Sequence, residues 1–272
     1  MFKSSRKKLI AIGCSYTADW NTFPPWPTVL AEMLDMDCVN LGDTGSGNDE
    51  ILAKTIDTVL NEKNIGLIVL MWSEWHRWSF QQSHSDWEYW WHVQPHRQNR
   101  VPRRMPCPKH KLNVNDWVPY LLEAQNPHHI TQQTFRTFIH AEKLLKDIPH
   151  LYVQGCFGIP WYNVKSGELI NCGDHTVNAH LNFFNVNNSR KEVARQMILS
   201  PYLEYIEDNI SKYFIGWPIM SEIGGYCFDE VLDKIDPSKL KLRISKKDSH
   251  PNGAGHKIIA QEIHNAYAKI YA

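Results

Sequence analysis

The feature that most constrains this chain is the alternation of short apolar segments with amphipathic helical segments over the first 72 residues. Apolar runs of strand length occupy residues 9–13, 38–41 and 66–71, and apolar residues recur at helical spacing in 26–34 and 48–61. Strands that alternate with helices of this size form βαβ units, whose strands run parallel. The pattern therefore predicts an α/β fold built on a parallel sheet.

The alternation resumes later in the chain. The spacing predicts helices over 131–146, 189–210 and 254–271, and a strand over 151–156. Two stretches without a clean period, at about 73–130 and 158–226, separate these elements. Insertions of this length in a compact domain usually carry function. We therefore expect one domain over 1–272, a three-layer α/β/α sandwich whose two long insertions form a lid.

Charge and hydropathy exclude several classes of partner. Lysine plus arginine and aspartate plus glutamate both number 29, so no overall field attracts nucleic acid or an anionic membrane. The apolar stretch after the basic start is too short for a secretory leader, and no window approaches the roughly 20 apolar residues of a membrane span. We expect a cytoplasmic protein with no nucleic-acid and no membrane partner; the sequence leaves its oligomeric state open.

Cysteines and histidines show no metal-binding pattern. The six cysteines include no Cys-x-x-Cys pair, which favours reduced thiols over a disulfide framework. The adjacent histidines His128 and His129, and the separate His175 and His180, lack the spacing of metal ligands and are typical of surface or core histidines. The sequence predicts no metal and no cofactor.

Two short motifs near the ends of the chain suggest nucleophilic chemistry. Gly-Cys-Ser-Tyr-Thr at 13–17 follows the first predicted strand, and His-Pro-Asn at 250–252 precedes the last predicted helix. A serine hydroxyl is a poor nucleophile unless a base removes its proton, so Ser15 and His250 form a candidate pair that folding must bring together. A plain strand-to-helix turn is the alternative for the first motif. No cation lies near Cys14 in the sequence, so we expect that thiol to be buried filler.

Two further features lie where ligands bind in parallel sheets, at the carboxyl ends of strands. The glycine-rich stretch 40–48 follows the second predicted strand and is able to aim backbone N–H groups at a ligand; a plain helix-entry loop is the alternative. A tryptophan-rich stretch follows the third strand, and within it Trp72 and Trp75 are candidate substrate-binding residues. The alternative for these rings is the core of the lid. The basic run at 96–111 also has two interpretations: a solvated loop or an anion-binding rim.

Taken together, these motifs resemble those of the SGNH (GDSL) hydrolase superfamily. The resemblance implies that Ser15 is the nucleophile and that its N–H, with that of Gly45, forms an oxyanion hole. Ser73 lies where the family has an asparagine donor, so Ser73 becomes the candidate third donor. The resemblance makes His250 the base, and Asp248, two residues earlier rather than three, the group that orients it. The family fold, a flavodoxin-like parallel sandwich, agrees with the α/β prediction.

The resemblance implies a serine-dependent ester hydrolase acting on a small-molecule or glycan ester, plausibly an O-acyl group on a carbohydrate. Two alternatives remain open: an acyltransferase on the same fold, and a non-catalytic carbohydrate-binding or virion-associated protein. A metal-dependent hydrolase is a more distant alternative. The Gly-Cys-Ser-Tyr-Thr variant also resembles proteins of tailed phages, which makes a viral source an additional expectation.

Overall fold

The computed structural model describes residues 6–84, 87–93, 127–156, 161–162, 169–170 and 186–271. Its central sheet has five strands in the order β2-β1-β3-β6-β9, and every neighbouring pair is parallel. The strands are β1 (Lys8–Gly13), β2 (Asp37–Asn40), β3 (Ile65–Trp72), β6 (His150–Gln154) and β9 (Phe214–Ile215). The parallel α/β fold predicted from the alternation is confirmed.

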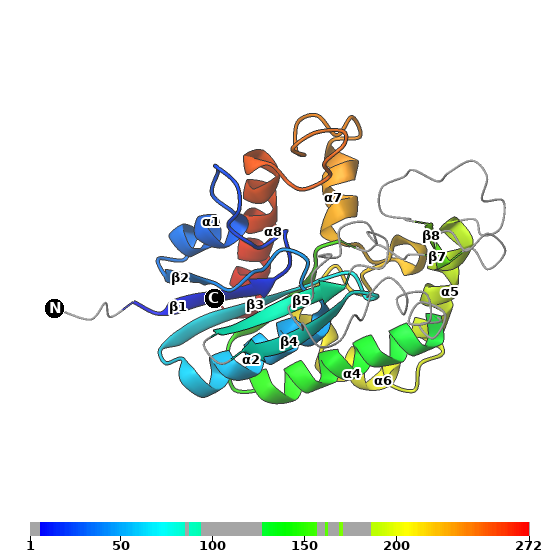
Figure 1. Cartoon of the computed structure of the whole chain (residues 1–272), viewed down its shortest axis with the longest axis horizontal. Coiled ribbons are helices and arrows are strands. Elements are labelled where there is room, and N and C mark those ends of the chain that lie inside the picture. The colour runs from blue at the N-terminus through cyan, green and yellow to red at the C-terminus, as the bar shows by residue number, and fades with distance from the viewer. Residues whose placement is uncertain are drawn as a thin grey trace.

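Helices cover both faces of this sheet. α1 and α8 lie on one face, and α2, α4 and α6 lie on the other, which makes the expected three layers (Figure 1). The helices are α1 (Trp26–Met33), α2 (Asn48–Asn61), α4 (Pro127–Leu145), α5 (Val186–Ile198), α6 (Leu203–Asn209), α7 (Phe228–Ile235) and α8 (Gly253–Tyr271). Short 3₁₀ turns occur at η2 (Ser211–Tyr213) and η3 (Ser221–Ile223). No helix in the described ranges is both long and apolar enough to cross a bilayer.

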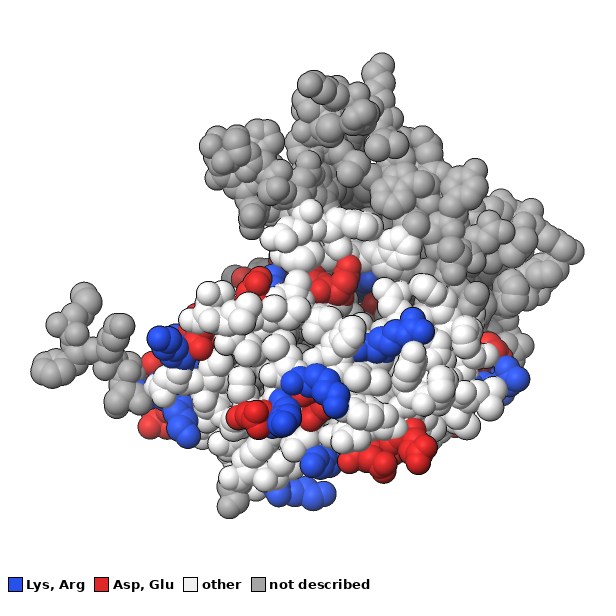
Figure 2. Space-filling view, turned by 90° about the horizontal axis from the view of Figure 1, so that it is seen from below, with Lys and Arg blue, Asp and Glu red and all other residues white. Residues whose placement is uncertain are grey.

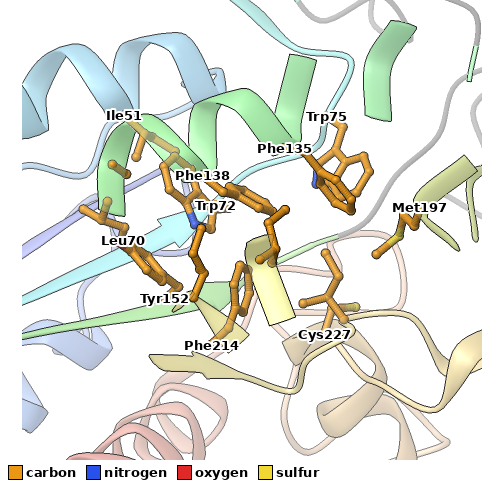
Figure 3. Packing of buried hydrophobic residues seen from close by; sticks show 14 of the residues in the cluster. Ile51, Leu70, Trp72, Trp75, Phe135, Phe138, Tyr152, Met197, Phe214 and Cys227 are labelled. Carbon is orange, nitrogen blue, oxygen red and sulfur yellow. The ribbon is translucent and has the colours of Figure 1, made fainter. Parts of the chain in front are cut away.

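The core is divided by the sheet into two clusters. Alternate residues of β3 point to opposite faces, so Leu70 packs toward α4 while Val69 packs toward α1 and α8. The α4 side is strongly aromatic: Trp72, Phe138 and Tyr152 are fully buried and pack on one another (Figure 3). Because all of β3 after its first residue is buried, this strand is the rigid centre from which the flanking loops emerge.

The structure corrects two predicted boundaries. The segment 189–210 is not one helix: α5 ends at Ile198 and α6 begins at Leu203, because Pro201 lacks the N–H that a continuous helix requires. The second irregular stretch also contributes a fifth strand, β9, which pairs with β6 through Tyr152 and Val153. A strand of two residues is too short to show a period in the sequence.

Two antiparallel hairpins lie in the described parts of the insertions. β4 (Trp78–His84) pairs with β5 (Trp87–Val93), and β7 (Trp161–Tyr162) pairs with β8 (Leu169–Ile170). The basic run at 96–111, along with His175 and His180, lies outside the described residues, so the lid stays a prediction. On the α2 and α4 face, acidic and basic side chains are interspersed rather than gathered by sign (Figure 2).

Two leucines near helix ends provide a matched test of the core. Leu145 in α4 is fully buried, whereas Leu60 in α2 is 74% exposed. We expect Leu145→Ala to lower the free energy of unfolding by about 2–5 kcal/mol and Leu60→Ala to change it by less than about 0.5 kcal/mol. Urea unfolding of both variants measures the difference. Equal losses would contradict this assignment of the core.

Candidate active site

Ser15 lies in a tight turn directly after β1. The N–H groups of Thr17 and Ala18 both donate to the carbonyl of Cys14, at 2.8 and 3.0 Å. Gly13 is required at the start of the turn, because a Cβ there would lie 2.3 Å from Thr17 Oγ1 and 2.9 Å from the carbonyl oxygen of Met71. The turn places the Ser15 hydroxyl at the carboxyl edge of the sheet.

His250 contacts both of its predicted partners. Its Nε2 lies 2.8 Å from Ser15 Oγ, and its Nδ1 lies 2.6 Å from Asp248 Oδ1. The same carboxylate oxygen accepts a bond of 3.1 Å from the backbone N–H of His250. This local turn explains how an aspartate only two residues before the histidine reaches the imidazole. The structure therefore brings together all three residues singled out in the sequence.

A buried arginine, Arg243, anchors the loop that carries His250 through hydrogen bonds and ion pairs. Arg243 Nη1 donates to the Ser249 carbonyl at 2.6 Å and to Tyr16 Oη at 2.9 Å. Its Nη2 binds Asp233 Oδ1 at 2.7 Å, and Asp229 Oδ1 lies 2.9 Å from Nη1. Because Tyr16 follows the nucleophile and Ser249 precedes the base, this cluster fixes one relative to the other. The sequence did not predict this cluster, because no local motif marks the arginine.

Trp20 and Asn252 complete the surroundings of the catalytic candidates. Trp20 Nε1 donates to the Ser15 carbonyl at 2.9 Å, and its ring meets the His250 ring edge-on at 5.1 Å. Trp20 remains 43% exposed. Asn252 Oδ1 accepts from the N–H of Gly255 at 3.1 Å, which caps the start of α8 directly after the histidine loop. Trp20 was also missed, although it lies only five residues from Ser15.

The glycine-rich loop packs against the Ser15 turn. The Asp43 N–H donates to the Gly13 carbonyl at 2.9 Å, and Asn40 Nδ2 donates to the Thr17 carbonyl at 2.7 Å. Gly45 has φ 94, a conformation that favours glycine. Within the described part of the chain, the backbone N–H groups of Ser15 and Gly45 have no acceptor, so both remain available to a ligand.

Ser73 is placed differently from the prediction. It is fully buried, and its backbone N–H donates to Asn48 Oδ1 at 2.8 Å. Its hydroxyl accepts a bond from Arg77 Nη1 at 3.0 Å. Because the Ser73 side chain is buried and bonded to Arg77, it supports the residues around Ser15 and is poorly suited to be the third oxyanion donor.

The two candidate substrate-binding tryptophans occupy the core. Trp72 has no exposed surface and Trp75 is 6% exposed. Trp72 packs on Phe138 with ring centroids 5.0 Å apart, and Trp75 meets Phe135 edge-on. Their burial corrects the prediction that these rings face a substrate, because neither presents a face to solvent. Both rings pack in the hydrophobic core, as the alternative interpretation expected.

The β4–β5 hairpin is attached to α2 by polar contacts. Ser79 Oγ accepts from the Gly47 N–H at 2.8 Å, and His92 Nε2 lies 2.7 Å from Glu50 Oε2. Among the described residues, Asp43, Glu50 and His92 could hold a metal, with one ligand atom each within 4.8 Å of the others. Lys54 Nζ already lies 2.7 Å from Glu50 Oε1 and supplies positive charge there. The group therefore forms an ion network that joins hairpin and helix.

Cys14 is fully buried, as expected, but a cation does lie near it. A hydrogen bond with the Cys156 thiol lowers the pKa of Cys14, burial opposes this, and the positive charge of Arg77 lowers the pKa further. The expectation that no cation approaches this thiol is therefore wrong. Sequence distance concealed the contact, because Arg77 reaches Cys14 across the carboxyl ends of neighbouring strands.

Removing the Arg243 cation should be costly. In Arg243→Gln the partly buried carboxylates of Asp229 and Asp233 lose their guanidinium, and because solvent screens them in part, we expect the free energy of unfolding to fall by about 2–4 kcal/mol. Arg6→Gln is the matched control, because the Arg6–Asp35 pair has side chains 57% and 81% exposed and should contribute under about 1 kcal/mol. Urea unfolding at pH 7 compares them. Similar losses of unfolding free energy in the two variants would contradict a structural role for the Arg243 cluster.

His256 gives a pH prediction. Burial, and then the charge of His250, lower the pKa of His256 to about 4, and its Nδ1 accepts the Trp26 N–H at 3.2 Å. Below about pH 6.5 the unfolded state binds the proton first, so stability present at pH 7 is lost as pH falls toward 4. The loss amounts to about 3 kcal/mol.

The variant His256→Asn keeps an acceptor near the Trp26 N–H but does not titrate in this range. We expect urea unfolding of the wild type to lose about 3 kcal/mol more than the variant between pH 7 and pH 4. The carboxylates titrate equally in both proteins, so the difference in pH dependence between them reports the imidazole of His256. Identical pH dependence would rule out this role for His256.

No protein-family model matches the sequence, and neither does any curated protein. Similar solved structures include a protein assigned to the lipolytic G-D-S-L family from Desulfitobacterium hafniense, with a TM-score of 0.47, 15% identity, and coverage of 96% of this chain and 99% of that one. A G-D-S-L family member from Veillonella parvula has a TM-score of 0.42 and 12% identity, covering 97% and 98%. The SGNH-hydrolase family esterase AlinE4 has a TM-score of 0.40 and 15% identity, and the match covers 100% of both chains. At such identities, the chemistry of this site must be inferred from its own geometry.

Proposed function

We propose that this chain is a serine-dependent ester hydrolase of the SGNH kind. The observation that carries the proposal is the row of contacts from Ser15 Oγ to His250 Nε2, at 2.8 Å, and from His250 Nδ1 to Asp248 Oδ1, at 2.6 Å. A carboxylate that holds the Nδ1 proton leaves Nε2 free to accept the serine proton. The arrangement supports activation of a hydroxyl for acyl transfer.

In the proposed reaction, Ser15 Oγ attacks the ester carbonyl carbon while His250 Nε2 takes the hydroxyl proton. The carbonyl π electrons move to oxygen and form a tetrahedral oxyanion. When the carbonyl re-forms, the bond to the leaving alcohol breaks and His250 returns the proton to that oxygen. Water then repeats the sequence on the acyl-enzyme and releases the carboxylic acid. Asp248 stabilises the imidazolium at each stage without taking its proton.

The N–H groups of Ser15 and Gly45 are the proposed backbone donors to the oxyanion. Both lack other acceptors in the described residues, and the Gly45 loop is held against the Ser15 turn by the Asp43 N–H. Donors fixed before the reaction cost no reorganisation when charge develops. Gly45 adopts a positive φ of 94°, which a residue without a side chain accepts at little cost, so a glycine at this position maintains the loop that presents the N–H group.

An O-acyl group on a carbohydrate is the substrate class we favour. Trp20 supports this choice, because it leaves 43% of its surface exposed while its ring contacts His250. An exposed aromatic ring beside the reacting atoms suits the apolar face of a sugar or a short acyl chain. The buried rings of Trp72 and Trp75 do not enter this proposal.

The decisive variant is Ser15→Ala. We expect hydrolysis of p-nitrophenyl acetate to fall by at least about 10³-fold, because the nucleophile is lost, and Asp248→Asn to lower kcat by about 10⁴-fold. Ser211→Ala, in the η2 turn remote from His250, should keep the wild-type rate. Spectrophotometric rates measure all three. A Ser15→Ala rate equal to the wild type would overturn the proposal.

A covalent probe tests the same assignment without a chosen substrate. A fluorophosphonate should label the wild type at Ser15, as located by mass spectrometry of the peptides, and should not label Ser15→Ala. Absence of labelling, together with measurable glycan binding, would favour a non-catalytic binding protein. Products formed with an added alcohol acceptor separate hydrolysis from acyl transfer.

A further inference from the structure

A charged group is buried where β3 ends. The side chain of Arg77 is only 5% exposed, and its Nε donates to Glu74 Oε2 at 2.7 Å. Its Nη1 donates to Ser73 Oγ at 3.0 Å. Burial lowers the pKa of the guanidinium, but the Glu74 carboxylate raises it above its ordinary value, so Arg77 stays charged. The protein therefore maintains a fixed cation at this edge of the sheet.

Arg77 is connected to both backbone donors of the proposed oxyanion hole. Ser73 Oγ bonds the guanidinium, and the positive charge of Arg77 lowers the pKa of Cys14, the residue whose peptide supplies the Ser15 N–H. On the other side, Gly47 packs over the Arg77 backbone so closely that a Cβ at Gly47 would lie 2.8 Å from the Arg77 carbonyl oxygen. The arginine thus lies between the nucleophile turn and the Gly45 loop.

The guanidinium also has unused hydrogen-bonding capacity. Nε and Nη1 have acceptors, but within the described part of the chain none bonds Nη2. Nη2 is not one of the fully enclosed polar atoms that lack a partner, so this end of the guanidinium is not sealed from solvent. Arginine presents its N–H groups in a rigid fork, so the bonds to Glu74 and Ser73 fix the direction of Nη2. Such an arrangement suits a group that receives its acceptor only from a ligand.

We propose that the Arg77 guanidinium is the third donor to the oxyanion, in the role predicted for Ser73. This inference rests on the proposed function. As Ser15 Oγ bonds the carbonyl carbon, the π electrons move to the carbonyl oxygen and the serine proton passes to His250. The Arg77 N–H then bonds the negative oxygen beside the N–H groups of Ser15 and Gly45, and releases it when the carbonyl re-forms. Arg77 keeps all its protons throughout.

Charge distinguishes this donor from an amide or hydroxyl. A hydrogen bond between a cation and an anion is about twice as strong as one between neutral groups. The ester carbonyl carries little charge before attack, so the interaction strengthens mainly in the transition state and acts on kcat more than on KM. Ser73 and Glu74 are positioning residues here, because they act through the arginine.

The test compares an ester with its thiono analogue, in which sulfur replaces the carbonyl oxygen. Sulfur is the weaker hydrogen-bond acceptor, so losing an oxyanion donor should slow the ester more than the thionoester. The variant is the double substitution Glu74→Gln with Arg77→Gln, which removes both charges of this ion pair together. Arg77→Lys keeps a charge without the fork, and Arg136→Gln, at an exposed position on α4, is the control. Circular dichroism and urea unfolding establish that each variant folds.

We expect the double variant to lower kcat for p-nitrophenyl acetate by about 10²–10³-fold with KM changed less than about threefold. The thionoester rate should fall far less, so the preference for the oxygen ester shrinks. Arg77→Lys should lie between, and Arg136→Gln should match the wild type. Equal loss on both substrates, or no loss, would overturn the role of Arg77 while leaving Ser15 as nucleophile. A wild type that neither hydrolyses ester nor labels at Ser15 would overturn the proposed function and this inference with it.

Discussion

The geometry of the site depends on one buried cation, Arg243. Its guanidinium binds Tyr16, which follows Ser15, and the Ser249 carbonyl, which precedes His250, while Asp229 and Asp233 of α7 neutralise it. Breaking any one of these contacts leaves a charge or a dipole without its partner in a partly buried cluster. The distance between hydroxyl and imidazole is therefore maintained by a network and does not depend on the flexible reach of either side chain.

Two charged arginines divide the support of the site between them. Arg243 holds the loop that follows α7, and Arg77 holds the segment that follows β3 against the glycine-rich loop. Both are almost completely buried, and both are paired with carboxylates. Buried ion pairs contribute little net stability, but well-paired ones favour one arrangement of the surrounding segments. Here that arrangement is the carboxyl edge of the sheet, where Ser15 and His250 lie.

The sequence predicted the parts of the molecule that repeat or lie close together in the chain. Alternating apolar runs were sufficient for the parallel sheet, because burial on both faces requires continuous apolar strands. The rule that ligands bind at the carboxyl ends of strands placed Ser15 correctly. Asp248 was found by its proximity to His250, and the structure adds the local turn that makes a two-residue spacing effective.

The remainder was hidden for physical reasons. Arg77 and Arg243 act through partners far away in the chain, and a lone arginine carries no spacing signal. β9 has two residues, too few for a period, and its place in the sheet depends on pairing with β6. Trp72 appeared to be near a pocket because it ends a strand, but the aromatic side chains of α4 take that ring into the core. The break between α5 and α6, by contrast, had a local cause that the sequence shows, Pro201.

The separation of Ser15 and His250 along the chain has a consequence for biosynthesis. Ser15 follows β1 and His250 precedes α8, and the two residues are 235 positions apart. The β1 segment therefore leaves the ribosome well before the segment that carries His250. Until that later segment has emerged, the Ser15 hydroxyl has no imidazole partner.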